Sequence, residues 1–343
     1  MARVLVIRLS ALGDVAISVP LVKALAEQYP EHEFIMVSQP MMAGLFDSCP
    51  SNVTFKPAAI RSIHKGIPGL YRLYREIGYR NIDVICDMHD VLRSRILCFF
   101  FSLHRLPVFR VNKERGHRRL LTRRKNKVLQ TLKTSFERYR DVFACAGLSL
   151  NYFDFRPKME SSKEHLSEME LLYGTKKGIW FGFAPFARHQ GKIYPLDKTE
   201  AVLSHFAGDE RFKVFLFGGG KQEMKHLKSW KERYPTLVMP NSISLKEEVR
   251  LISCMDLMFS MDSANMHLGS LAHTPVISVW GATHHFAGFY GLFQAERNRI
   301  QVDLPCRPCS IFGNKPCYRK DYACMNMISH ETIITRIYEE VGL

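Results

Sequence analysis

The sequence predicts an α/β protein built from two Rossmann-like domains, each with a parallel sheet covered by helices. Strand-like apolar runs alternate with stretches of helical apolar periodicity, which is typical of parallel sheets with helices on both faces. This pattern pauses at the polar segment 151–165, an expected linker, and then starts again. A chain of 343 residues, 46% of them hydrophobic, can form two such cores and is not typical of disorder.

The first domain is expected to span residues 1–160. Gly13 breaks its opening strand, and Pro20 suggests that the following helix starts late or kinks. The expected strands are 4–7, 34–37 and 83–86; the expected helices are 15–28, 70–77 and a basic stretch over 93–140 that breaks near Pro107.

The second domain is expected to span residues 161–328. Its expected strands are 178–183, 214–217, 237–239, 257–259 and 275–280, and its expected helices are 197–206, 246–253 and 265–272. A last helix over 329–341 belongs to a C-terminal segment, 329–343, that we expect to pack back on the first domain. Parallel sheets bind ligands at the carboxyl ends of their strands, and two facing domains form a cleft there. Motifs at those strand ends are therefore candidate site residues.

The formal net charge of +15 is unevenly distributed. Residues 1–160 contain 26 Lys and Arg against 14 Asp and Glu, whereas the remainder contains 22 against 19. Such a basic half predicts an acidic partner: nucleic acid, an anionic membrane surface or a phosphorylated substrate. Nucleic acid is not expected, because Phe136 and Tyr139 are the only Phe, Tyr or Trp rings between Arg110 and Arg140.

The chain opens on a charged strand rather than on a secretory signal, and no apolar stretch reaches membrane-spanning length. We therefore expect a cytoplasmic protein that touches a membrane, at most, from its inner face.

The first motif reads R-L-S-A-L-G-D over residues 8–14 and lies between the first strand and its helix. Gly13 allows close backbone approach, and a helix N-terminus favours an anion. Asp14 in the first turn has two readings: it caps the helix and interacts with its dipole, or it takes part in chemistry. The spacing is not that of a dinucleotide-binding fingerprint.

Two further motifs lie in the second half. Lys192 follows the strand at 178–183, where it either neutralises a phosphate or is a solvated loop lysine. Asp262 and Ser263 follow another strand and start a helix, so they cap that helix or, with its free N–H groups, bind a diphosphate. His267, one turn later, reaches the same anion or packs in the core.

Taken together, these motifs resemble the glycosyltransferase family that contains the lipopolysaccharide heptosyltransferases, glycosyltransferase family 9. The resemblance spans essentially the whole chain in the right order. It rests on residues 8–14, D-V-I-C-D at 83–87, Lys192 followed by an aromatic residue and Pro195, F-G-G at 217–219 with Glu223, Asp262-Ser263 with His267-Leu268, and Gly281 and Thr283 after Trp280.

The resemblance implies the GT-B fold, with the acceptor in the first domain and a nucleotide-sugar donor in the second. It implies that Asp14 is the general base of an inverting, metal-independent transfer. The donor site would comprise Lys192, Glu223, Asp262, Ser263, Ala264 and His267, and the acceptor site Ser10, Gly13, Arg118 and Arg119. Two positions depart from the family pattern, since Ala264 and Asp90 stand where glycine is common.

Four cysteines are clustered in the pattern C-x2-C-x7-C-x6-C: Cys306, Cys309, Cys317 and Cys324. Close thiols in a cytosolic protein predict a structural zinc site. Reduced thiols that pack a loop remain an alternative, as do disulfides, which the compartment disfavours. Members of the resembled family can carry a similar segment, so a shared structural role is expected. No cofactor is expected for catalysis.

The expected function is transfer of a heptose or related sugar from a nucleotide donor, ADP-heptose, to an acidic lipid-linked acceptor, the lipopolysaccharide inner core. The arginines at 118, 119, 123 and 124 would hold the enzyme on the anionic inner-membrane surface. Two alternatives remain: transfer of another sugar to another glycan, and a non-catalytic basic protein that binds nucleic acid. The combination of Asp14, Lys192 and Asp262 argues against the latter.

Overall fold

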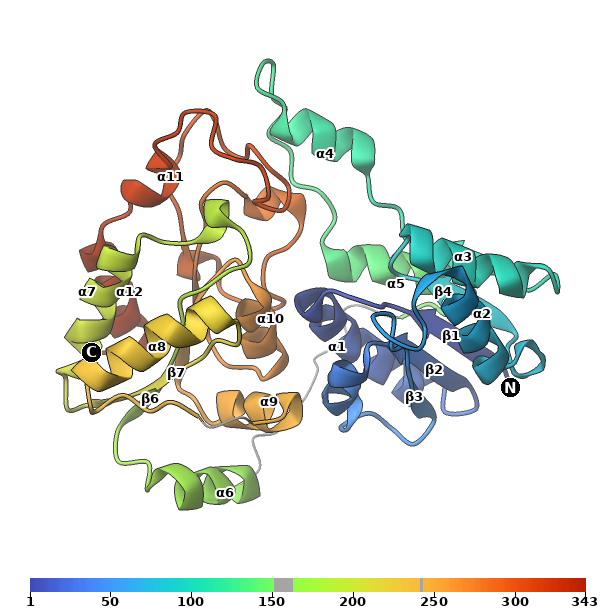
Figure 1. The fold of residues 1–343 in the computed structure, drawn as a ribbon, viewed down its shortest axis with the longest axis horizontal. Coiled ribbons are helices and arrows are strands. Elements are labelled where there is room, and N and C mark those ends of the chain that lie inside the picture. The colour runs from blue at the N-terminus through green and yellow to red at the C-terminus, as the bar shows by residue number, and fades with distance from the viewer. Residues whose placement is uncertain (151–162, 241–242) are drawn as a thin grey trace. The chain divides into compact units, whose positions relative to one another are not determined.

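The computed structural model describes residues 1–150, 163–240 and 243–343, and the chain divides into two compact units (Figure 1). The first unit comprises Met1–Lys113 and Lys133–Lys158, and the second comprises Glu114–Leu132 and Met159–Leu343. The boundary expected at residue 160 lies outside the described residues and stays a prediction. The segment Glu114–Leu132, however, belongs to the second unit although it interrupts the first in sequence.

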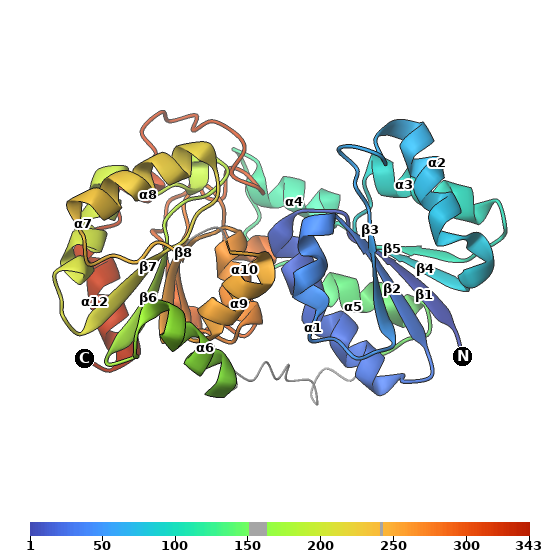
Figure 2. The same cartoon turned by 60° about the horizontal axis from the view of Figure 1, so that its bottom comes forward.

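The first unit contains a five-stranded parallel sheet in the order β3-β2-β1-β4-β5. Figure 2 shows α2 and α3 on one side of this sheet and α1 and α5 on the other. The strands are β1 (Arg3–Ile7), β2 (Glu33–Ser38), β3 (Val53–Pro57), β4 (Val84–Asp87) and β5 (Val108–Arg110). The helices are α1 (Leu12–Gln28), α2 (Gly66–Ile77), α3 (Leu92–Ser102) and α5 (Ser135–Cys145), with short 3-10 turns at Pro40–Phe46 and Tyr79–Asn81.

The second unit contains another five-stranded parallel sheet, in the order β10-β9-β8-β6-β7. Its strands are β6 (Ile179–Ala184), β7 (Phe212–Leu216), β8 (Leu257–Met261), β9 (Val276–Val279) and β10 (Arg299–Ile300). Its helices are α4 (Arg115–Thr122), α6 (Lys163–Tyr173), α7 (Leu196–Ala207), α8 (Lys221–Arg233), α9 (Leu245–Ser253), α10 (Ala264–Leu271), α11 (Ala323–Asn326) and α12 (His330–Val341), with 3-10 turns at Gln190–Lys192, His285–Ala287 and Glu296–Asn298.

Both sheets place their central strands in fully apolar surroundings. Every residue of β8 is buried, as are the last four residues of β1, because helices cover both faces of a parallel sheet. In each parallel sheet the order in which successive strands are added reverses between two central strands. These are β1 and β4 in the first sheet and β6 and β8 in the second. Ligands of open parallel sheets bind outside the carboxyl ends of the strands at such switch points.

Several expected elements differ in the structure. Residues 237–239 form one isolated bridge, between Phe215 and Val238, rather than a strand. The basic stretch over 93–140 is not continuously helical, since β5 follows Pro107 and pairs with β4. Pro20 lies inside α1, which runs from Leu12 without the expected late start.

The C-terminal helix α12 is part of the second unit, and the expected packing of this segment on the first domain stays a prediction. Its buried Ile333 and Ile337 join the core that also contains Phe206 and Phe259, and the helix packs on α7. Burial of this apolar face fixes the helix to its own sheet. The linker expected at 151–165 lies outside the described residues up to 162, and its last three residues start α6. Among the described residues, no helix is both long and apolar enough to cross a bilayer.

Candidate active site

The first candidate group lies where β1 ends and α1 begins, and it is centred on Asp14. The buried Arg8 directly follows β1, and its Nη2 lies 2.5 Å from Oδ2 of Asp14. Tyr139 of α5 donates its hydroxyl to Oδ1 of the same carboxylate at 3.3 Å. The Arg8 guanidinium also lies 5.5 Å from the centroid of the Tyr139 ring and donates to the carbonyl of Met88 at 2.7 Å. The Asp14 carboxylate is thus held by side chains from two other parts of the chain, while 27% of its side-chain surface is exposed.

The protonation states of these neighbours suit a fixed carboxylate. Burial alone lowers the pKa of Arg8, but Asp14, together with Tyr139 and Asp87, more than offsets this, so the pKa of Arg8 is raised. Burial raises the pKa of Tyr139, which keeps its hydroxyl a donor. A carboxylate held in this way can accept a proton from a hydroxyl at its exposed edge. The N-cap of α1 is Ala11, and Asp14 lies in the first turn, where its charge also interacts favourably with the helix dipole.

A second set of side chains follows β4. The buried Asp87 accepts hydrogen bonds from the backbone N–H groups of His89 and Asp90, both at 2.9 Å, and from the Ser94 hydroxyl at 2.9 Å. These bonds fix the turn between β4 and α3. Burial, assisted by the Arg8 cation, lowers the pKa of His89 to about 3, so His89 is neutral near pH 7.

Asp90, where the family commonly has glycine, has a φ of 45°. This left-handed conformation is one that glycine adopts easily and that aspartate tolerates better than most residues. The Asp90 carboxylate pairs with Arg95 at 2.6 Å, and the Lys113 ammonium donates to the Asp90 carbonyl at 2.9 Å. The departure from glycine at this position is therefore compatible with the turn.

The expected acceptor residues are divided between the two units. Ser10 and Gly13 flank the Asp14 group in the first unit, whereas Arg118 and Arg119 lie on α4 in the second. The Arg118 guanidinium lies over the rings of Phe289 and Phe312, at 5.2 and 5.9 Å from their centroids. The charge-based expectation placed these arginines in the first domain because sequence order alone does not show where α4 packs.

The candidate donor group follows β8 in the second unit. Lys192 Nζ lies 2.7 Å from Oδ2 of Asp262, and the Thr283 hydroxyl donates to the same oxygen at 2.7 Å. The two charged side chains are mostly buried, at 15% and 3% exposure. The structure thus brings two of the expected donor residues into direct contact and adds Thr283. A buried cation that shares one carboxylate oxygen with a hydroxyl is well placed to be redirected towards a phosphate.

The start of α10 supplies the second part of this group. Ser263 is the N-cap residue, its side chain forms no capping hydrogen bond to the helix, and its hydroxyl lies 3.2 Å from that of Ser260. Ala264 is the first helical residue, and the buried His267 lies one turn further along. The N–H groups at this helix end, together with its dipole, favour an anion.

Glu223 has a local structural role. Its Oε2 accepts from the backbone N–H groups of Gly219 and Gly220, at 2.9 and 3.1 Å, and so fixes the glycine turn at the start of α8. This arrangement satisfies N–H groups at a helix N-terminus. The expected contact of Glu223 with the donor remains a prediction.

Sequence reasoning missed the residue that supports the donor group. The buried Arg307 donates to the carbonyls of Gly281, at 2.6 Å, and Thr283, at 3.0 Å, and also bonds to Val302 and Gln301. These contacts brace the loop that carries Thr283. The signal was present as an arginine between Cys306 and Cys309, but nothing in the sequence indicated its backbone partners.

Close packing of glycines also positions Lys192. A Cβ on Gly313 would lie 2.7 Å from Lys192 Cγ, and a Cβ on Gly191 would lie 2.7 Å from the Cβ of Ala282. Gly313 also has a φ of 74°, which side chains rarely adopt. The aliphatic part of Lys192 thus lies directly on the backbone of the cysteine segment.

The four clustered cysteines surround this same segment as free thiols. Burial raises the pKa of Cys324 to about 11, and the neighbouring cysteines contribute to the increase. Within residues 1–150, 163–240 and 243–343, no three His, Cys, Asp or Glu side chains are arranged to hold a metal ion. As arranged here, the thiols do not form a coordination site, and zinc stays a prediction. Lys127, next to α4, donates to the carbonyls of Cys306 and Pro308, at 2.7 and 2.9 Å.

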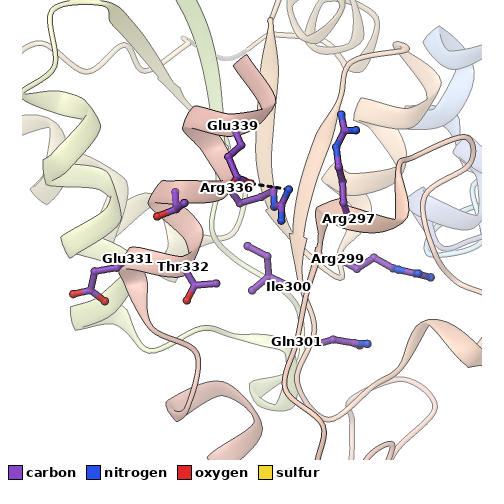
Figure 3. A pocket seen from close by; sticks show the side chains of 9 residues that line it. Arg297, Arg299, Ile300, Gln301, Glu331, Thr332, Arg336 and Glu339 are labelled. Carbon is purple, nitrogen blue, oxygen red and sulfur yellow. Dashed lines mark ion pairs between the residues drawn. The ribbon is translucent and has the colours of Figure 1, made fainter. Parts of the chain in front are cut away.

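A cavity of about 460 Å³ opens elsewhere in the second unit, between β10 and α12 (Figure 3). Its arginines form ion pairs with glutamates, including the Arg336–Glu339 pair at 2.8 Å that is drawn as a dashed line. None of the candidate donor residues lines it. The cavity is therefore separate from the candidate donor group.

Comparison with known proteins identifies the family. Residues 70–316 match the model of glycosyltransferase family 9 (heptosyltransferase). The chain is 24% identical to lipopolysaccharide heptosyltransferase 1 of Campylobacter coli over 99% of both chains. It is similar in fold to a family 9 glycosyltransferase from Veillonella parvula, with a TM-score of 0.75, 18% identity and coverage of 99% and 97% of the two chains.

A second solved structure, the Escherichia coli heptosyltransferase WaaC with ADP, has a TM-score of 0.66 and 19% identity over 98% of this chain and 99% of that one. At such identities, the likeness to solved structures shows the fold, and it confirms the expected α/β, GT-B class. The family match covers most of the chain, so this protein belongs to glycosyltransferase family 9, the heptosyltransferase family, and is a glycosyltransferase.

Proposed function

We propose that this enzyme transfers a heptose from ADP-heptose to the inner core of lipopolysaccharide, with inversion at the anomeric carbon. The acceptor hydroxyl oxygen attacks that carbon, the bond from the carbon to the diphosphate breaks, and Asp14 takes the hydroxyl proton. The reaction needs a base because a sugar hydroxyl is a poor nucleophile. The exposed edge of Asp14, fixed by Arg8 and Tyr139, supports this role.

The observation that carries the proposal is the Lys192–Asp262–Thr283 group beside the start of α10. The leaving ADP gains negative charge as the glycosidic bond breaks. A lysine ammonium and the N–H groups of a helix end would stabilise that charge more in the transition state than in the ground state. This chemistry needs no metal ion, so we assign the cysteine cluster no catalytic role and, at most, a structural zinc.

The names of the relatives support the choice of substrates. The Campylobacter coli relative is a lipopolysaccharide heptosyltransferase, and the Escherichia coli structure contains ADP. In the proposal, the first domain binds the acceptor and the second binds the donor. The excess of basic residues in the first half suits an acidic, lipid-linked acceptor on the cytoplasmic face of the inner membrane.

The test compares nucleotide sugars directly. ADP-heptose should protect the protein against thermal unfolding more than UDP-glucose does, because a ligand stabilises the state that binds it. Purified heptose-deficient lipopolysaccharide should then become labelled with heptose in the presence of the enzyme. Turnover with another nucleotide sugar, and none with ADP-heptose, would contradict the proposed donor.

A further inference from the structure

The outer side of α2 and α3 in the first unit carries a group of large apolar side chains that face solvent. We call this the α2–α3 face and define it as Ile63, Ile67, Tyr71, Leu92, Phe99 and Leu103. Leu92 is 74% exposed and Phe99 57% exposed. Single exposed apolar residues are ordinary on protein surfaces, but a contiguous group marks an interaction site.

Ring contacts and helical spacing join the central part of this face, from Ile67 and Tyr71 on α2 to Phe99 and Leu103 on α3. The half-buried Phe100 links the two helices: its ring meets that of Tyr71 edge-on at 5.4 Å and that of Phe99 at 6.1 Å. Ile67 lies one turn before Tyr71 on α2, and Leu103 one turn after Phe99 at the end of α3. The two helices also pack side by side, as Figure 1 shows.

The fold does not need these side chains for its core. The buried positions of α3 are Ser94, Leu97, Cys98 and Phe101, and those of α2 include Leu73 and Ile77. They pack on the sheet and leave the opposite sides to the α2–α3 face. A surface helix is normally polar on its outer side. Helix α3 is apolar on both sides, and folding requires only the side that packs on the sheet to be apolar.

The charges around this face are almost all positive. Residues 61–77 contain four Lys and Arg and one acidic residue, Glu76, and residues 92–105 contain three Arg and no acidic residue. Two of these cations are in ion pairs, since Glu76 pairs with Arg72 as well as with Lys56 and His64, and Asp90, just before α3, pairs with Arg95. Arg61, Lys65, Arg93 and Arg105 are exposed. An apolar centre with a cationic border matches a membrane interface that contains anionic lipids.

We propose that the α2–α3 face docks this enzyme on an anionic lipid bilayer. A second copy of the chain fits less well, because a two-fold contact would bring the exposed cations Arg61, Lys65, Arg93 and Arg105 against their own copies. Docking would bring the enzyme to a lipid-linked acceptor, and this purpose rests on the proposed function. In this proposal the membrane contact lies on α2 and α3 rather than on the arginines expected from sequence, because two of those arginines pack on aromatic rings. Arg118 on α4 lies over the rings of Phe289 and Phe312, and Arg124, after α4, lies 4.6 Å from the ring centroid of Tyr318.

Co-sedimentation with vesicles tests the proposal. The parent should bind vesicles of phosphatidylethanolamine and phosphatidylglycerol, and bind phosphatidylcholine vesicles weakly. Phe99→Asp with Leu103→Asp should reduce binding to the anionic vesicles at least about tenfold, because two apolar side chains no longer enter the interface. The matched control is Leu171→Asp with Leu172→Asp, which makes the same change at exposed positions of α6 in the second unit and should bind like the parent.

A charge variant and a measurement of the oligomeric state in solution complete the design. Arg61→Gln with Arg105→Gln should weaken binding about fivefold per charge at low salt, and the loss should shrink as salt rises. Equal binding by the parent and the Phe99/Leu103 variant would overturn the proposal. So would a parent dimer that this variant converts to monomers while vesicle binding persists.

Turnover on a short, lipid-free acceptor separates this proposal from the proposed function. The Phe99/Leu103 variant should keep that turnover, because neither residue belongs to the candidate active site. Absence of turnover in the parent would contradict the proposed reaction and leave the vesicle result intact. Loss of vesicle binding by the α6 control as well would overturn the assignment to α2 and α3.

Discussion

Replacing Asp14 with asparagine removes the negative charge that neutralises the buried Arg8. The ion pair is short, at 2.5 Å, and 9% of the Arg8 side chain is exposed. Removing one partner of a fully buried pair costs about 3–5 kcal/mol. Since 27% of the Asp14 side chain is exposed, we expect a smaller loss in the free energy of unfolding, about 2 kcal/mol, measured by urea denaturation.

The same substitution should lower turnover by about two to four orders of magnitude if Asp14 is the general base, because the amide cannot take the proton. Binding of ADP-heptose, measured by calorimetry, should persist. The stability loss and the catalytic loss then have to be separated, since a poorly folded variant is also a poor enzyme.

The double variant Arg8→Gln with Asp14→Asn separates them. It replaces the ion pair with two neutral amides, so it should recover much of the stability that Asp14→Asn loses. Turnover should remain as low as in Asp14→Asn. Recovery of turnover together with stability would refute the reasoning, because it would show that Asp14 serves only as the partner of Arg8.

Four further outcomes are expected. Lys192→Ala should weaken donor binding or turnover by about 1–3 kcal/mol, measured by calorimetry and steady-state kinetics; unchanged values would remove Lys192 from the donor site. Arg307→Met should lower the free energy of unfolding by about 3 kcal/mol in urea, because buried carbonyls lose their donor. Elemental analysis of protein purified without added metal should find about one zinc per chain if the four cysteines hold it, and none if they are packed thiols. Since the pKa of His89 is lowered to about 3 and an unfolded histidine titrates near 6.5, stability should be complete above about pH 6.5 and fall by up to about 1.4 kcal/mol per pH unit towards pH 3. His89→Gln should flatten that decline in urea titrations, and an unchanged slope would assign it to other groups.

Local sequence patterns predicted the sheets well, because buried parallel strands are short apolar runs that end in motif residues. Strand β8 and the residues after it are an example: Asp262 and Ser263 lie where the strand pattern placed them. Strands β3, β5 and β10 were missed: β5 and β10 are too short to give a periodic pattern, and all three lie at or near sheet edges, where they form by pairing with a neighbouring strand.

The sequence predicted only those candidate site residues that lie within local motifs. Asp14 and Lys192 lie in recognisable strand-end sequences. Tyr139, which donates to Asp14, is 125 residues away in the chain and entered the sequence reasoning only as an aromatic ring in a basic stretch. Arg307 likewise acts through backbone carbonyls that carry no sequence signal. Partners brought together by tertiary packing are not encoded by local periodicity.

The placement of Glu114–Leu132 has the same cause. Charge counting assigns this segment to the first half, but its buried Leu121 and Leu132 pack with Ala287 of the second unit. The Leu132 backbone N–H also donates to the Phe286 carbonyl at 2.8 Å. Domain membership therefore depended on a small apolar cluster that sequence order hides.

The contact between Gly313 and Lys192 limits how this chain can vary during evolution. Any side chain at 313 would displace the stem of the lysine, so a substitution there would disturb the Lys192–Asp262 ion pair although the residue is 121 positions downstream. The nearby Phe312 and Tyr318 are half exposed, so substitutions and short insertions can accumulate around them. The cysteine segment should therefore diverge among relatives at its exposed aromatic residues while the glycine beneath the lysine persists.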